Sequence, residues 1–174
     1  MTLDHQAIKR LKAHDNPTFE KIYDETKRGV YAIVFSVTKS HEDTNDLLQD
    51  VYMKMLIKID QYKVGSNFLN WLLQIAKNHA IDYYRREKKV TRVDEDQIHH
   101  IQSNYDENPD ESDQFQRMIE ALDEDERMIV LLKIVDDLTH QEIAKITQKP
   151  LGTVLWIYQK AINKLKRFGG DVHE

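Results

Sequence analysis

The stretch LTHQEIAKITQKPLGTVLWIYQKAINKLKRF, residues 138–168, decides the fold of the C-terminal part of the chain. Within it, Thr139-His140-Gln141-Glu142 is a capping box, in which the first and fourth side chains satisfy free N–H groups at a helix start. Gln148 and Lys149 form a turn, and Pro150 takes a position favoured at the start of the next helix. A short helix, a tight turn and a longer basic helix predict a helix-turn-helix.

The long helix of this motif has two different faces when successive residues are placed about 100° apart. An apolar side is expected to pack on the preceding helices: Leu151, Val154, Tyr158, Ala161 and Leu165. The candidate DNA-binding residues point elsewhere: Thr153, Trp156, Gln159, Lys160, Asn163 and Lys164. Amide, hydroxyl and cationic groups can bond base edges and phosphates in a major groove. A solvated helix face is the alternative.

Helices are also predicted throughout the N-terminal half. Asn16-Pro17 is a helix-start signal, and Ser40 followed by acids caps the next helix. A turn at Gly65-Ser66 precedes a third helix from about Asn67 to Arg86, and a short helix near Leu3–Leu11 comes before them all. Glycine (5) and proline (3) are scarce among the 174 residues, which also favours helices.

Charge is distributed unevenly around a net value of −5. Residues 77–92 and 150–168 are basic, whereas residues 94–113 hold eight acids and no lysine or arginine. We therefore predict an all-α protein of two small helical domains joined by an acidic flexible linker, with the helix-turn-helix in the second domain. The predicted ranges are 1–92 for the first domain, 93–113 for the linker and 114–174 for the second domain.

Several function classes are excluded or disfavoured. The chain has no cysteine, so disulfides and cysteine-ligated metals are excluded. The eight histidines show no metal-ligand spacing, and no phosphate-binding or nucleophile motif occurs, so we expect no catalytic residue, metal or cofactor and no enzymatic activity. With no signal peptide at its start and no apolar run of about 20 residues, the expectation is a cytoplasmic protein that does not insert into a membrane.

Two segments of the first domain carry candidate binding residues. Asp43, Asp46, Gln49 and Asp50 share one helix face, which could serve metal binding, catalysis, protein docking or simple solvation. The third helix mixes cations, amides and an aromatic ring, a combination suited to single-stranded DNA. Its candidate residues are Asn70, Trp71, Lys77, Asn78, Arg85, Arg86 and Lys88. The alternative is that Trp71 belongs to the core and the cations are solvated.

Taken in order, four segments resemble the extracytoplasmic-function group of bacterial RNA polymerase sigma factors. They are HDNPTFEKIY (14–23), HEDTNDLLQDVY (41–52), FLNWLLQIAKNHAIDYYRR (68–86), and the helix-turn-helix with its LTHQEIA and PLGTV sequences. The resemblance implies that the acidic face docks on the clamp of the polymerase large subunit. It also implies that the third helix holds the separated strand, that the loop Glu87–Asp94 captures a flipped-out base, and that the last helix enters the major groove.

The resemblance further implies promoter DNA, the polymerase flap and an anti-sigma factor as partners. One departure is informative: after Gly152-Thr153-Val154 the family commonly has Lys-Ser-Arg, whereas this chain has Leu155-Trp156-Ile157. Either the distal promoter element is altered, or Trp156, Gln159 and Lys160 carry a greater share of recognition. The competing hypotheses are a free-standing dimeric helix-turn-helix regulator and a protein-interaction adaptor that uses the acidic face.

Overall fold

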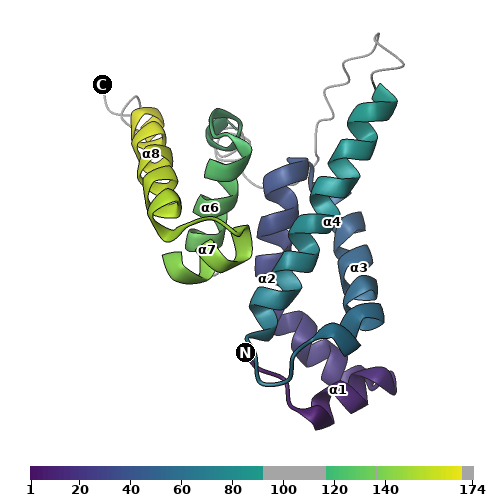
Figure 1. Cartoon of the computed structure of the whole chain (residues 1–174). Coiled ribbons are helices and arrows are strands. Elements are labelled where there is room, and N and C mark those ends of the chain that lie inside the picture. Colours follow the sequence, from purple (N-terminus) through teal and green to yellow (C-terminus); the bar gives the residue numbers. More distant parts are fainter. Residues whose placement is uncertain (92–116, 136, 170–174) are drawn as a thin grey trace.

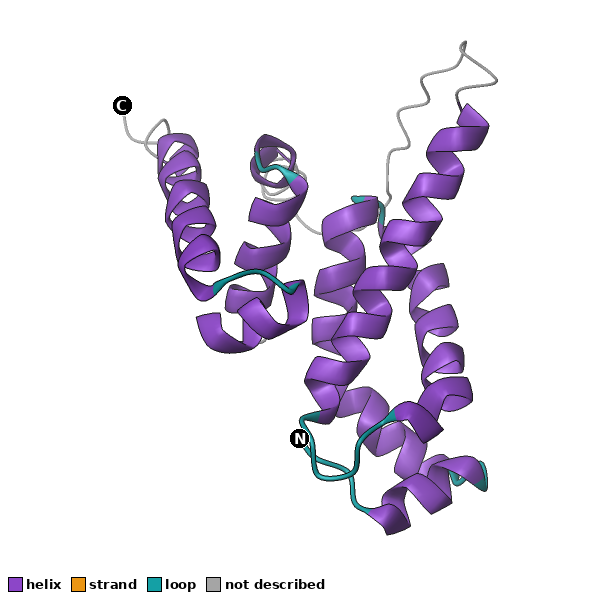
Figure 2. Cartoon of the chain, viewed as in Figure 1, coloured by secondary structure: helices purple, strands orange, loops and turns teal. Residues whose placement is uncertain are grey.

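A computed structural model describes residues 1–91, 117–135 and 137–169 of the chain (Figure 1). Every regular element within these ranges is a helix (Figure 2), which confirms the all-α prediction. No helix in the described ranges is long and apolar enough to cross a membrane. The predicted acidic linker, 93–113, lies outside the described residues, so the domain boundaries at 92 and 113 stay predictions.

The N-terminal module is a helical bundle in which α2 contacts α1, α3 and α4. Its helices are α1 (His5–Lys12), α2 (Asn16–Thr38), α3 (His41–Lys58) and α4 (Phe68–Thr91), with a short 3-10 turn at Ile59–Gln61. Asp15, and not Asn16, caps α2, and Ser40 caps α3 as predicted. Because α4 continues to Thr91, the first residues of the expected base-capturing loop are helical.

The C-terminal module contains α6 (Glu124–Val135), α7 (His140–Thr147) and α8 (Leu151–Gly169). The capping box predicted at Thr139 and Glu142 forms at the start of α7. Gln148, with a φ of 57°, then turns the chain in the left-handed region, a conformation that ends many helices. The two helices α7 and α8 therefore form the expected helix-turn-helix, with α6 packed against both.

The two modules share one hydrophobic core, which the sequence pattern did not indicate. Helix α6 packs along α2, and α7 packs on α4 (Figure 1). Ile33 of α2, Leu73 of α4 and Ile129 of α6 belong to the same buried cluster and are fully shielded from solvent. Close-packed apolar contact of this kind is the dominant stabilising contribution in a small helical protein. The described residues thus form a closed arrangement of both modules.

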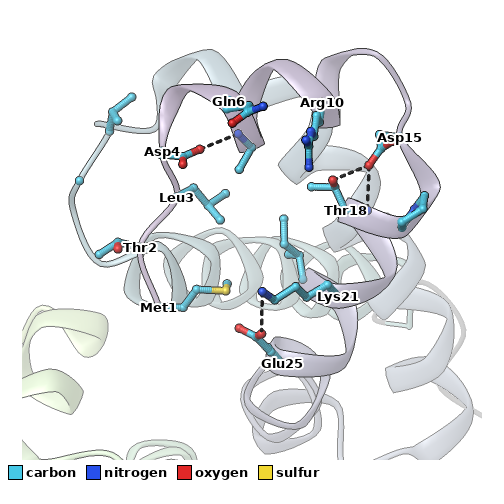
Figure 3. Close-up of a pocket in the computed structure, with 15 residues that line it drawn as sticks. Met1, Thr2, Leu3, Asp4, Gln6, Arg10, Asp15, Thr18, Lys21 and Glu25 are labelled. Atoms are coloured by element: carbon cyan, nitrogen blue, oxygen red, sulfur yellow. Dashed lines mark hydrogen bonds and ion pairs between the residues drawn. The ribbon is translucent and has the colours of Figure 1, made fainter.

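A cavity of about 870 Å³ opens at the far end of the N-terminal module, between α1, the start of α2 and the turn at Gly65 (Figure 3). Its charged lining is mixed, with Arg10 and Lys21 alongside Asp15 and Glu25. None of the residues predicted to bind polymerase or DNA lines it. The candidate sites therefore lie on helix surfaces and not in this cavity.

Candidate functional site

The acidic face predicted from the sequence lies along α3. Asp46, Gln49 and Asp50 are exposed, whereas Asp43 is half-buried and accepts a hydrogen bond from the Tyr83 hydroxyl at 3.3 Å. Met53 and Ile57 are also exposed on this helix, which was not predicted from the sequence. Met53 lies three residues beyond Asp50, within the spacing that places residues on one helix face. Their exposure could have been predicted from the sequence, because both residues fall outside the apolar stripe by which α3 packs.

A buried histidine on α4 holds the carboxylate of Asp50. The Nδ1 atom of His79 lies 2.6 Å from Lys54 Nζ, and its Nε2 atom lies 3.2 Å from Asp50 Oδ2. Because an ammonium group only donates, Nδ1 accepts and Nε2 carries the proton that is donated to Asp50. Burial lowers the pKa of His79, and the positive charges of Lys54 and Arg86 lower it further, against the opposing effect of Asp50. The imidazole is thus neutral at pH 7.

This arrangement predicts a pH-dependent stability. The folded-state pKa of His79 lies below the value of about 6.5 of the unfolded chain. The unfolded chain therefore binds more protons, and the stability contributed by His79 is lost as pH falls from about 6.5 through the folded-state pKa. We expect His79→Gln, which removes this titration, to lose less unfolding free energy than the wild type between pH 7 and pH 5.5 in urea titrations. Equal losses would assign the acid sensitivity to another group.

The predicted DNA-binding residues of α4 differ in how exposed they are. Asn78, Arg85 and Arg86 are exposed. In contrast, Trp71 is half-buried, with its ring centroid 5.5 Å from that of Tyr62, so it contributes to packing. The side chain of Lys88 lies outside the described residues, and Asn70 is half-buried at the start of the helix.

Part of α4 is covered by the C-terminal module. Lys77 Nζ donates to the backbone oxygen of Thr147 at 3.3 Å, and Gln74 Nε2 donates to that of Lys145 at the same distance. Both acceptors lie at the C-terminal end of α7, where free carbonyl groups favour a cation. Burial lowers the pKa of Lys77, as does the nearby charge of Lys149. In the closed arrangement, Lys77 is therefore engaged within the protein.

The structure brings together most of the predicted residues of α8. A surface hollow of about 410 Å³ is lined by Trp156, Gln159, Lys160, Asn163, Lys164 and Arg167. Thr153 is exposed nearer the helix start. Lys160 Nζ lies 5.4 Å from the centre of the Trp156 ring, within the range of a cation–π contact. One expectation for this helix was wrong: Leu151 does not pack inward but is exposed, whereas Ile157 is buried.

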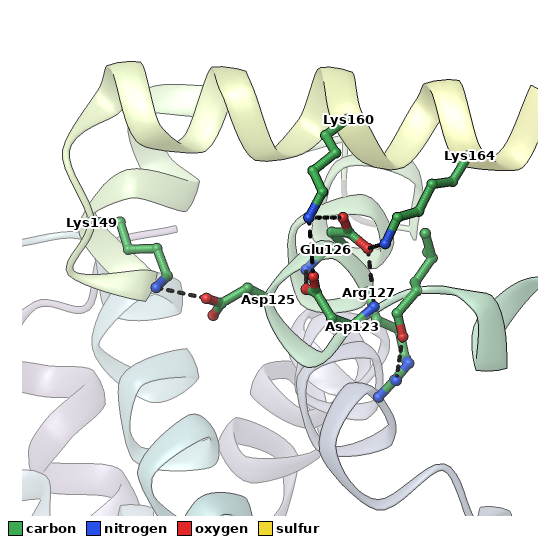
Figure 4. Close-up of polar contacts among 8 residues, drawn as sticks. Asp123, Asp125, Glu126, Arg127, Lys149, Lys160 and Lys164 are labelled. Atoms are coloured by element: carbon green, nitrogen blue, oxygen red, sulfur yellow. Dashed lines mark hydrogen bonds and ion pairs between the residues drawn. The ribbon is translucent and has the colours of Figure 1, made fainter.

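The two lysines of this hollow contact an internal carboxylate (Figure 4). Lys160 Nζ lies 2.8 Å from Glu126 Oε1, and Lys164 Nζ lies 2.6 Å from Oε2. Only 1% of the Glu126 side chain is exposed. Burial alone would raise the pKa of Glu126, but Lys160, Lys164 and the backbone N–H of Asp123 hold it to about 2. Glu126 is therefore ionised at neutral pH and offsets part of the positive charge of α8.

A buried arginine connects the two modules. The guanidinium of Arg127 donates to the backbone oxygens of Ile119 at 3.0 Å and Leu122 at 2.7 Å, both within the C-terminal module. It also donates to the backbone oxygen of Ser36, on α2. The role of Arg127 could not be predicted from a sequence pattern, because it donates to backbone oxygens, one of them on a distant helix.

Two known protein families match this chain, one over the part that contains α3 and α4 and one over the part that contains most of α8. Sigma-70 region 2 matches residues 22–90, and Sigma-70 region 4 matches residues 112–166. The chain is 28% identical to the ECF RNA polymerase sigma factor SigX of Bacillus subtilis over 138 residues, covering 74% of this chain and 71% of SigX. It is also 28% identical to the ECF RNA polymerase sigma-E factor of Escherichia coli K12 over 165 residues, covering 87% and 86% of the two chains.

Solved structures support the fold. The sigma factor RpoE of Bartonella quintana, crystallised with the anti-sigma factor NepR, superposes with a TM-score of 0.75 at 23% identity. The match covers 90% of this chain and 98% of that one. The structure of CnrH, solved with the cytosolic domain of CnrY, gives a TM-score of 0.68 at 16% identity and covers 97% and 98% of the two chains. With both sigma-70 regions present in order and ECF relatives that cover 74% and 87% of it, this chain belongs to the extracytoplasmic-function group of bacterial RNA polymerase sigma factors.

Proposed function

We propose that this sigma factor docks on core RNA polymerase through α3, and that α4 and α8 then contact promoter DNA. Membership of the group makes it a factor for promoter-directed transcription initiation, which is a regulatory role and not a catalytic one. The observation that carries the residue-level proposal is the exposed row of Asp46, Gln49 and Asp50 on a helix that matches region 2. Complementary charge on such a surface speeds encounter and fixes the docking register.

Promoter binding requires the closed arrangement to open. Lys77 is engaged by the end of α7, and α4 and α7 pack against each other. A promoter presents two elements that one factor must contact simultaneously, at a spacing that polymerase sets. Polymerase binding would hold the modules apart and raise their effective concentration at the two elements. This accounts for a DNA-binding protein with a net charge of −5, since tight recognition belongs to the complex and not to the free chain.

The factor acts in the cytoplasm without enzymatic activity of its own, and we propose that an anti-sigma factor restrains it. The support for the inhibitor is that RpoE, a sigma factor of the same fold, was solved in complex with the anti-sigma factor NepR. The apolar side chains that remain exposed on α3, Met53 and Ile57, offer contact area beside the acidic face for polymerase or for such an inhibitor.

Run-off transcription tests the proposal directly. Core bacterial RNA polymerase is mixed with fragmented genomic DNA from the source organism, with and without the protein. We expect discrete start sites that appear only when the protein is present, and these sites define both promoter elements. Failure to associate stably with core polymerase, together with dimeric binding of the free protein to a palindromic duplex, would contradict the proposal and favour a free-standing regulator.

A further inference from the structure

The exposed start of α8 is apolar where related factors commonly carry cations. Leu151, Leu155 and Trp156 are 39%, 45% and 64% exposed. Ile157 is only 7% exposed and belongs to the core. Of the three residues at 155–157, two are therefore available to an outside surface, and both are large and apolar.

The cations of the same helix are less available than their sequence positions suggest. Lys160 contacts both Glu126 and Asp123, at 2.8 Å and 3.5 Å, and Lys164 contacts the same Glu126 carboxylate (Figure 4). An ammonium group held by a buried carboxylate has fewer free N–H donors and a shorter reach for bonding a base edge. Its charge still attracts DNA, because no acid occurs between residues 150 and 168. These lysines thus favour DNA approach more than discrimination among bases.

Gly152 adds a second observation at the helix start. It is exposed, and a Cβ atom built on it would meet no heavy atom within 4 Å. No internal contact therefore requires glycine here, although glycine weakens helices. A residue without a side chain on an exposed helix start is suited to close approach of another surface. Because the start of a helix carries the positive end of the helix dipole, the phosphate backbone of DNA is a favourable surface to approach it.

We propose that α8 reads the distal promoter element mainly through apolar contacts of Leu155 and Trp156 with the C5-methyl groups of thymines. Thymine is the base that presents a methyl group in the major groove, and apolar side chains recognise it there. This combines the two alternatives left by the sequence: the distal element is altered, and Trp156, together with Leu155, carries a greater share of its recognition. The inference rests on the proposed function, because it requires α8 to enter the groove.

Deoxyuridine is the sharpest probe, because it differs from thymidine only by that methyl group. Holoenzyme binding is measured on a promoter obtained by run-off transcription, with each thymine of the distal element replaced in turn. We expect about fourfold weaker binding for each methyl group in contact. Unchanged binding at every position, or a distal element without A·T pairs, would overturn the inference.

Variants of Leu155 and Trp156 test whether these side chains cause the difference in binding between thymine and uracil. Leu155→Ala and Trp156→Ala should weaken binding to the thymine promoter and abolish the difference between thymine and uracil at the contacted positions. Ile134→Ala is the matched control, because Ile134 is an exposed apolar residue of the same module on α6, and it should retain the full difference.

The failures are distinguishable. A difference that persists in both variants overturns the assignment to Leu155 and Trp156. Weaker core-polymerase binding by these variants, without any thymine dependence, also overturns it and identifies the patch as a protein contact. If the wild-type protein forms no initiating holoenzyme at all, the proposed function fails, and this is seen before any uracil is introduced.

Discussion

Asp50→Arg is expected to weaken binding to core RNA polymerase by about 100-fold while leaving the helical fold intact. Asp50 is exposed on α3, so the longer side chain can be accommodated in solvent, and the local loss is the hydrogen bond from His79 Nε2. A docking surface on the polymerase that complements acids would meet a like charge instead. The measurement is the dissociation constant for core polymerase, determined by fluorescence anisotropy of labelled protein, with circular dichroism to verify helix content. Wild-type affinity in the variant would remove Asp50 from the docking surface.

Two companion variants separate charge from shape. Asp50→Asn keeps the size of the side chain and an oxygen that can accept from His79 Nε2. We expect an intermediate loss of about tenfold, because only the charge is removed. Glu20→Arg reverses another exposed acid, on α2 and outside the acidic face, and should bind core polymerase as the wild type does. A loss in Glu20→Arg equal to that in Asp50→Arg would indicate a general effect of net charge and not a docking site.

The sequence predicted local structure well, because the signals for helix ends are local. The Ser40 cap, the Thr139 capping box and the turn at Gln148 are confirmed. Each depends on residues within four positions of one another, so the chemistry of a short segment is sufficient. The helix-turn-helix and the all-α class followed from these signals and from the apolar periodicity.

Contacts between distant segments could not be predicted in the same way. Helical periodicity placed Lys160 on a polar face, but only the fold brings the buried Glu126 within 2.8 Å of it. Leu151 was assigned to the core from its spacing, yet it is 39% exposed, and the first fully buried side chain of α8 is that of Val154. The contact of α7 with α4 likewise depends on tertiary packing, which a pattern in a single segment does not encode.

Arg127→Met is expected to lower the free energy of unfolding by about 3 kcal/mol. The guanidinium is 2% exposed and satisfies three backbone oxygens, on Ile119, Leu122 and Ser36. Methionine fills a similar volume but donates no hydrogen bond, so these carbonyl groups lose a charged donor in a buried site. Urea unfolding followed by circular dichroism measures the change. Arg167→Met, which alters an exposed arginine on α8, should stay within about 0.5 kcal/mol of the wild type.

The regions that Arg127→Met destabilises show whether Arg127 acts within the C-terminal module or between the two modules. Two of the three acceptors lie in the C-terminal module, and the third, Ser36, lies on α2. Arg127→Lys keeps the charge but cannot present the same fork of donors, so we expect it to fall between the wild type and Arg127→Met. If Arg127 joins the modules, amide hydrogen exchange should accelerate near Ser36 as well as in α6. Acceleration confined to α6 would show that the bond to Ser36 contributes little, and that apolar packing between α2 and α6 holds the closed arrangement.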